Sequence, residues 1–168
     1  MSQWIDDLKL RIPDYAKDTR LNLDGVVLRS TLGELALPVA LAAAFATGNK
    51  VLVEAISADP ALPEVERNAA LSAAALMAMN NTWYPFVEMA DSKELSGLPA
   101  QLRMNVYASN GGTSKKNFEA YALAASIVGK CHFCVKSHFD LLAKEGMSTE
   151  QLRDVGRVAA VIAAAARF

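Results

Sequence analysis

The stretch CHFCVKSH, residues 131–138, contains both cysteines and both histidines of the 168-residue chain. Cys131 and Cys134 are three residues apart, and His138 follows Cys134 by four. In an α-helix this spacing brings the three side chains onto one face. No other part of the chain has comparable redox or nucleophilic chemistry, so we expect the stretch to form a helix that carries the function.

Helix boundaries are predicted on both sides of this stretch. Ser114 is a favourable N-cap for a helix that extends to about Gly129, just before the motif. The motif opens the next helix, which extends to about Lys144, and Gly146 is suited to its C-terminal end. The two cysteines are therefore expected in the first turn of a helix.

Helical patterns also cover most of the remaining chain. The predicted helices are residues 2–10, 31–46, 51–57, 63–79 and, after a capping box of Ser148 and Gln151, a last helix to about Arg167. Pro38 lies inside the second of these and predicts either a kink or a restart there. The predicted loops are residues 59–63, 91–100 and 110–114, which are rich in turn-forming residues.

Composition points to an all-α fold. Hydrophobic residues make up 52% of the chain and aromatic residues only 7%, with 9 glycines and 6 prolines, and the apolar share comes largely from alanine and leucine. This balance favours packed helices over strands. The length fits one compact helical domain that spans residues 1–168.

Charge and hydropathy narrow the choice of partners. With 17 basic and 18 acidic side chains the net charge is −1, so no overall field attracts nucleic acid or an acidic membrane. The most apolar stretches are shorter than the roughly 20 residues that a membrane span requires. The first residues show no signal-peptide pattern. We expect a cytoplasmic protein whose partner is a small molecule or another protein.

A faint repeat occurs at a spacing of fifty residues. Ala70, Ala74 and Ala75 precede Ala120, Ala124 and Ala125 by that distance, and in the same register Asn81 corresponds to Cys131 and Tyr84 to Cys134. Two related helix pairs, only one with thiols, are one explanation. The alanine-rich composition is the other, because such matches arise easily in it.

The start of a helix favours a thiolate. Its unpaired N–H groups and partial positive charge lower the pKa of a cysteine from ~8.5 to between ~3.5 and ~7.5. Such a pair can alternate between dithiol and disulfide. His138 is the candidate base, because an imidazole within reach of a thiol accepts its proton. Glu119, the only acid between Glu94 and Asp140, is the candidate carboxylate that orients this imidazole.

Other interpretations of the cysteines compete with this one. The motif contains enough ligands for a zinc site, although four ligands within eight helical residues do not converge tetrahedrally. Two buried, inert cysteines in a core helix are a second alternative, against which the polar neighbours Lys130, Lys136 and Ser137 favour a partly exposed site. Haem attachment requires histidine where this chain has Val135, and a thioredoxin-like fold requires a βαβ pattern that is missing.

Over nearly its whole length the chain resembles the AhpD-type alkyl hydroperoxidases of the carboxymuconolactone decarboxylase-like superfamily. The segments that carry the resemblance are residues 13–18, 21–23, 79–81, 102–105, 117–119 and 131–138. The resemblance implies an all-helical subunit, usually a trimer, that reduces organic hydroperoxides with electrons from a lipoylated protein. It also implies a peroxiredoxin partner, AhpC, that is recycled through the same dithiol.

The resemblance also implies a role for each site residue. Cys134 matches the peroxidatic cysteine, which becomes a sulfenic acid, and Cys131 matches the proton donor and resolving thiol. His138 and Glu119 match the proton relay. Position alone favours Cys131 as the more acidic thiol, because it is nearer the helix start. The resemblance points to Cys134 instead, as does the closeness of His138 to Cys134 in the sequence.

One position departs from the family pattern. Some relatives have histidine directly before the second cysteine, where this chain has Phe133, and the histidine lies one residue earlier, at His132. A shift of one residue turns a side chain by ~100° around a helix. His132 is therefore either an auxiliary catalytic residue or an exposed polar one.

The expected activity is lipoyl-dependent reduction of alkyl hydroperoxides through a Cys131–Cys134 dithiol–disulfide cycle. No bound cofactor or metal is expected, and dihydrolipoamide on a carrier protein supplies the electrons. The main alternative is a dithiol adaptor that passes electrons to a peroxiredoxin and has little peroxidase activity of its own. A carboxymuconolactone-type decarboxylase is a third candidate, which would not require the two cysteines.

Overall fold

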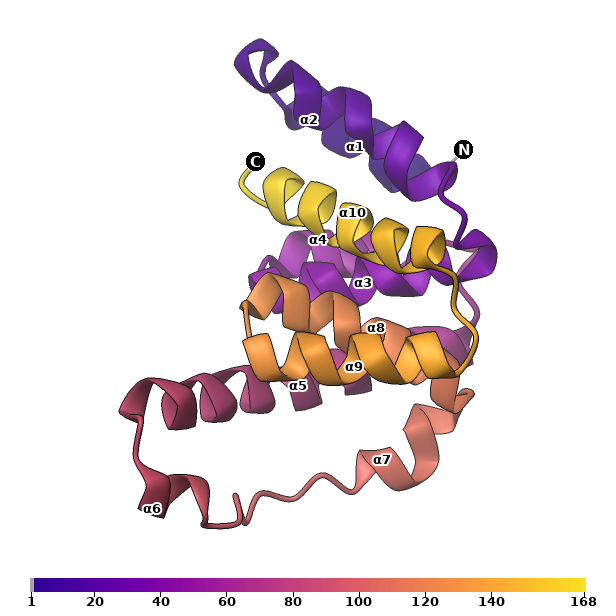
Figure 1. Ribbon diagram of the computed structural model, residues 1–168. Helices are drawn as coiled ribbons and strands as arrows, with labels where there is room; N and C mark the ends of the chain where they lie inside the picture. The colour runs from indigo at the N-terminus through magenta and orange to yellow at the C-terminus, as the bar shows by residue number, and fades with distance from the viewer. Residues whose placement is uncertain (1) are drawn as a thin grey trace.

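The computed structural model describes residues 2–168, and every regular element in this range is helical. The helices are α1 (Gln3–Arg11), α2 (Lys17–Asn22), α3 (Ala36–Thr47), α4 (Lys50–Ser57), α5 (Glu64–Ala90), α6 (Lys93–Ser96), α7 (Val106–Ser109), α8 (Lys115–Gly129), α9 (His132–Lys144) and α10 (Thr149–Ala165). Short 3₁₀ helices also occur, at η1 (Asp14–Ala16), η3 (Gly33–Leu35) and η4 (Asn110–Gly112), and η2 (Leu23–Leu28) is a π-helix. The all-α prediction is confirmed (Figure 1).

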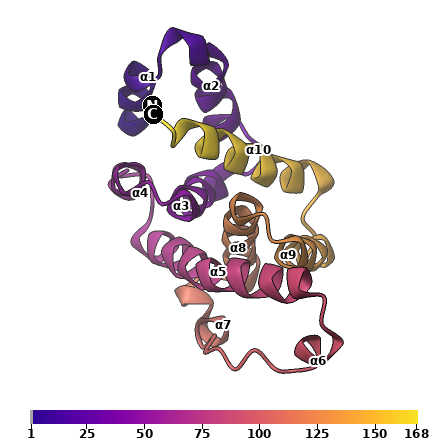
Figure 2. The same cartoon turned by 90° about the vertical axis from the view of Figure 1, so that its left-hand side faces the viewer.

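Helix α8 forms the centre of the molecule. It packs against α3, α5, α9 and α10, which surround it in Figure 2. All nine residues from Phe118 to Ser126 are buried, as expected for a helix enclosed on every side. The chain enters the motif directly from this central helix, so the start of α9 is anchored in the core.

Local signals set most helix ends as predicted. Ser114 caps α8 through the Asn117 N–H at 3.1 Å, and Ser148 and Gln151 form the capping box of α10. Gly146, with φ +83°, follows the end of α9 in the left-handed region that favours glycine. Pro38 is the third residue of α3, where a missing N–H breaks no helical hydrogen bond, so the helix restarts rather than kinks.

Helix α5 is longer than predicted. It continues through the expected end at Met79 to Ala90 and contains Pro85. Asn80 is only 4% exposed, and the side-chain N–H of Asn81 donates to the Ala125 carbonyl of α8 at 3.1 Å. These tertiary contacts offset the low helix propensity of asparagine and proline there.

The continuous α5 also bears on the fifty-residue repeat. That register requires a helix break at Asn81, because its counterpart Cys131 lies at the break between α8 and α9. Helix α5 has no break there. In this register α5 therefore does not reproduce the break between α8 and α9. Of the matched alanines, Ala75 is exposed whereas its counterpart Ala125 is buried. Within residues 91–100, predicted as loop, four residues form the short α6.

Beyond Asn81 much of α5 extends past the core, and the chain returns through α6 and an extended segment to α7 (Figure 1). The first turns of α9 lie beside this part of α5, with which α9 is in contact. Among residues 2–168 no helix combines the length and apolar character of a membrane span.

Asp154 ties the N-terminal region to α10. Its Oδ2 accepts hydrogen bonds from the Thr31 backbone N–H at 2.8 Å and from the Thr31 hydroxyl at 3.0 Å. Its Oδ1 accepts from Arg157 at 2.9 Å and from Arg153 at 3.3 Å. Burial raises the pKa of this carboxyl, but the bonds from Thr31, Arg157 and Arg153 outweigh it and lower the pKa to about 2.

Replacing Asp154 with Asn is expected to reduce the free energy of unfolding at pH 7 by about 2 kcal/mol, because the variant lacks the charge that these donors stabilise. Since the pKa is below its ordinary value, the contribution is present at neutral pH and is lost as the pH falls from about 4 to 2. Urea unfolding of both proteins across this range measures it. Asp140→Asn, which removes an exposed ion pair with Lys136, is the control and should change stability by less than about 1 kcal/mol. A wild-type advantage over Asp154→Asn as large at pH 2 as at pH 7 would contradict the assignment.

Candidate active site

The break between α8 and α9 positions the first cysteine. Lys130 ends α8 in the left-handed region with φ 55°, and Cys131 is the N-cap of α9. The Cys131 N–H donates to the Ser126 carbonyl at 3.3 Å. The Cys131 Sγ accepts the backbone N–H of Cys134 at 3.2 Å. The sulfur therefore takes the place of the capping oxygen at this helix start.

Cys131 and Cys134 are joined by a disulfide, with their Cα atoms 5.3 Å apart. Cys131 is 0% exposed and Cys134 is 3% exposed. The prediction of a partly exposed site was wrong for the cysteines, because both are buried although the charged neighbours Lys130 and Lys136 are exposed.

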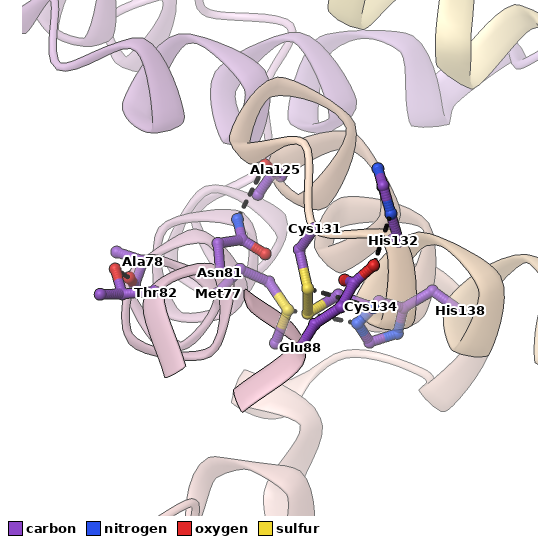
Figure 3. The surroundings of a disulfide bond; sticks show 10 residues. All are labelled: Met77, Ala78, Asn81, Thr82, Glu88, Ala125, Cys131, His132, Cys134 and His138. Carbon is purple, nitrogen blue, oxygen red and sulfur yellow. Dashed lines mark hydrogen bonds and ion pairs between the residues drawn. A yellow bond between two sulfur atoms is a disulfide. The ribbon is translucent and has the colours of Figure 1, made fainter. Parts of the chain in front are cut away.

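Glu119 and His138 form a buried pair, and Figure 3 shows the imidazole of this pair beside the disulfide. The Glu119 Oε2 lies 2.5 Å from the Nδ1 of His138, and each side chain is 7% exposed. Glu119 belongs to α8 and His138 to α9, so the pair links the central helix to the motif helix. A carboxylate at this nitrogen fixes the orientation of the imidazole and leaves Nε2 free to face other groups.

Met77 of α5 completes this arrangement, and sequence reasoning missed it. Its Sδ lies 3.2 Å from the Nε2 of His138, and Figure 3 shows the thioether, the disulfide and the imidazole clustered together. Met77 is 0% exposed and continues the buried face of Ala70, Ala73 and Ala74. A methionine at helical spacing from core alanines is typical of the core, so no sequence signal distinguished it.

Tyr107 of α7 lies near the same pair. Its burial, followed by the charge of Glu119 and then Tyr84, raises the pKa of the phenol to about 12, against a smaller lowering by the Asn80 amide. The phenol is therefore protonated at neutral pH. Tyr107 and Asn80 were also not singled out from the sequence.

Asn81 packs against the turn that precedes Cys131. Its Nδ2 donates to the Ala125 carbonyl at 3.1 Å (Figure 3). A Cβ placed on Gly129 would lie only 2.2 Å from the same nitrogen. Glycine is thus required for α5 to approach the end of α8 this closely.

His132 lies apart from the buried pair. Its Nδ1 is 3.0 Å from the Glu88 Oε1, and the two side chains are 82% and 56% exposed. Beside it the ring of Phe133 stacks on Tyr84 with centroids 4.4 Å apart. These four residues line an open groove of about 660 Å³ between α9, α6 and the end of α5, together with Val87, Asp91, Ser96 and Lys136.

The imidazoles do not converge on the sulfurs as zinc ligands would. His138 uses Nδ1 for Glu119, and His132 faces Glu88 at the surface. Among residues 2–168 no three His, Cys, Asp or Glu side chains cluster in the manner of a metal site. The arrangement that is present combines a disulfide at a helix start with a buried imidazole–carboxylate pair, which suits thiol–disulfide chemistry with proton transfer.

Comparison with known proteins agrees with this arrangement. The profile of the Carboxymuconolactone decarboxylase family matches residues 93–168, which include α8, the motif and α10. The protein named alkyl hydroperoxide reductase AhpD from Rhodopseudomonas palustris is 44% identical over 161 residues, which cover 94% of this chain and 88% of that protein. The chain belongs to the AhpD family.

Two further AhpD proteins are similar over comparable lengths. The Coxiella burnetii protein is 44% identical over 92% of this chain and 90% of its own length. The Rhodospirillum centenum protein is 43% identical over 96% of this chain and 88% of its own length. These matches cover 92–96% of the chain, so the family assignment extends well beyond the residues 93–168 that the profile matches.

Gly129→Ala is expected to lower the free energy of unfolding by about 1–3 kcal/mol, because the added methyl group collides with the Asn81 side chain. Gly156→Ala in α10 is the matched control, since a Cβ there meets nothing within 4 Å. That change should stabilise the protein by about 0.5–1 kcal/mol, because alanine suits a helix interior better than glycine. Urea unfolding of both variants tests the close approach, which equal stabilities would disprove.

Proposed function

We propose that this protein is a thiol peroxidase that reduces alkyl hydroperoxides through a dithiol–disulfide cycle of Cys131 and Cys134. The relatives named alkyl hydroperoxide reductase support the reaction class. The observation that carries the proposal is the buried Glu119–His138 pair beside a CxxC disulfide at a helix start. A structural disulfide would need neither the pair nor the helix start.

In the proposed cycle the Cys134 thiolate attacks one oxygen of the hydroperoxide. The O–O bond breaks, Cys134 becomes a sulfenic acid, and the alcohol leaves with a proton passed from Cys131 or through His138. The Cys131 sulfur then attacks the sulfenic acid, which forms the disulfide and releases water. Glu119 keeps the His138 imidazole oriented for proton transfer throughout.

A dithiol carrier then resets the disulfide. We propose dihydrolipoamide on a carrier protein, which gives up two electrons and two protons and becomes the cyclic disulfide. When the S–S bond opens, the Cys134 N–H that contacts the Cys131 Sγ at 3.2 Å stabilises negative charge on that sulfur. Cys131 is therefore the sulfur released first, and the carrier attacks Cys134.

The proposal extends to the other expected partners. The peroxiredoxin AhpC would be reduced by the same dithiol, and the subunit would assemble as a trimer. The open groove lined by Tyr84, Glu88, His132 and Phe133 adjoins the motif helix and is where a carrier or a peroxiredoxin would approach. In this proposal His132 belongs to that approach surface and not to the buried relay.

A coupled assay with reduced lipoamide and cumene hydroperoxide tests the cysteine roles. Cys134→Ser and Cys131→Ser should each lower turnover at least 100-fold, because each removes one half of the disulfide cycle. Cys131→Ser should still consume about one equivalent of peroxide and accumulate a sulfenic acid that dimedone traps, whereas Cys134→Ser should not.

Two outcomes would redirect this proposal. Turnover that survives both substitutions would eliminate the thiol mechanism. Rapid reduction of an oxidised peroxiredoxin by wild-type protein that does not itself consume peroxide would assign the protein as a dithiol adaptor.

Glu119→Gln is expected to lower turnover 10²- to 10⁴-fold, the range for loss of a general acid–base function. The amide keeps the shape of the side chain but not its charge. Glu54→Gln, at an exposed position of the distant α4, is the matched control and should leave turnover within twofold. Circular dichroism of both variants verifies the fold, and full activity of Glu119→Gln would remove Glu119 from the relay.

A further inference from the structure

The position of Met77 indicates which nitrogen atoms of His138 carry a hydrogen while Cys131 and Cys134 form the disulfide. The Nε2 of His138 is the nitrogen available to exchange a proton with a cysteine, because Nδ1 lies 2.5 Å from Glu119. Its hydrogen-bond partner is the Met77 Sδ at 3.2 Å. The contact joins α5 to α9 and is buried, with Met77 0% and His138 6% exposed (Figure 3).

A thioether sulfur carries no proton and can only accept a hydrogen bond. A contact of this kind therefore requires a hydrogen on Nε2. A further proton lies between Nδ1 and the Glu119 Oε2, because without it two lone pairs would face each other in a buried contact. Together the imidazole and the carboxylate hold two protons and have no net charge.

The other protonation state is unfavourable in this environment. With a single proton, on Nδ1, the bare Nε2 lone pair would face the lone pairs of Met77, and the pair would carry a net negative charge. Both side chains are only 7% exposed, and an uncompensated charge is costly to bury. The geometry and the burial thus favour the same state, in which Nε2 is protonated.

We propose that Met77 is a positioning residue for His138. The Met77 Sδ accepts a hydrogen bond from the Nε2–H of His138 while the cysteines form the disulfide, so that His138 holds the proton that is required when the disulfide opens. The structural part of this inference stands on the contact itself. Its catalytic consequence rests on the proposed function.

The proton and electron balance of this step is complete. The carrier dithiol supplies two electrons and two protons. Its first sulfur attacks Cys134, which breaks the Cys131–Cys134 bond and forms a mixed disulfide, and its second sulfur then attacks the first, which forms the carrier disulfide and releases Cys134. The first released cysteine sulfur takes the proton from His138 Nε2 and becomes a thiol. When the second carrier thiol closes the carrier disulfide, its proton reloads the His138–Glu119 pair. The proton of the first carrier thiol passes through solvent to the other cysteine.

The decisive measurement is ¹⁵N NMR of the imidazoles in the oxidised protein. The chain contains only two histidines, so the spectrum of a His132→Gln variant assigns the signals of His138. We expect Nε2 of His138 to show a directly bonded hydrogen in the wild type between pH 6 and 8. In Met77→Leu, which removes the acceptor but nearly keeps the volume, this hydrogen should exchange faster or disappear.

Met79→Leu is the matched control, because Met79 is a half-buried methionine on the same helix. Its spectrum should match that of the wild type. In the lipoamide-dependent assay Met77→Leu should lower kcat about fivefold with KM unchanged, as expected for loss of one hydrogen bond, and Met79→Leu should change neither.

The NMR result is independent of turnover, so failure of this inference is distinguishable from failure of the proposed function. A bare Nε2 in oxidised wild type, or a Met77→Leu spectrum identical to that of the wild type, would overturn the role of Met77 even in an active peroxidase. A protonated Nε2 that depends on Met77 in a protein without peroxidase activity would keep the positioning role and overturn the proposed reaction. The wild-type spectrum alone decides the protonation state if Met77→Leu does not fold.

Discussion

The buried contact between Glu119 and His138 is the constraint on which the functional region depends. Glu119 lies within nine consecutive buried residues of the central helix α8, where an unpaired carboxylate would be strongly unfavourable. The His138 imidazole at 2.5 Å supplies its partner. Because the two residues belong to α8 and α9, satisfying the carboxylate also sets the position of the motif helix against the core.

Helix α5 supplies the third side of the same site. Met77 contacts the imidazole, Asn80 lies near the Tyr107 phenol, and Asn81 holds the end of α8 through the Ala125 carbonyl. These residues fall within one and a half turns of α5. Helix α5 therefore contacts the imidazole of α9 and the end of α8 through side chains that do not titrate themselves.

Local signals predicted the elements well, and tertiary contacts account for the errors. Ser114, Ser148 and Gly146 act on residues only a few positions away, so their effect is readable from the sequence. The end of α5 was misplaced at Met79, because the stabilising contact of Asn81 comes from α8, forty-four residues later. The exposure of the cysteines was also mispredicted, since the lysines beside them indicate only where those lysines point.

The sequence by itself determined that the protein is helical, that both cysteines begin a helix, and that Cys131, Cys134 and His138 share one helical face. These properties follow from composition and from spacing within a few turns. Only the tertiary structure decided that the disulfide is buried, that His132 faces Glu88 at the surface, and that the Nε2 of His138 meets Met77, sixty-one residues away in the chain. The reason is physical: helix propensity and capping depend on neighbours in sequence, whereas burial and hydrogen-bond partners depend on helices that meet only when the chain packs.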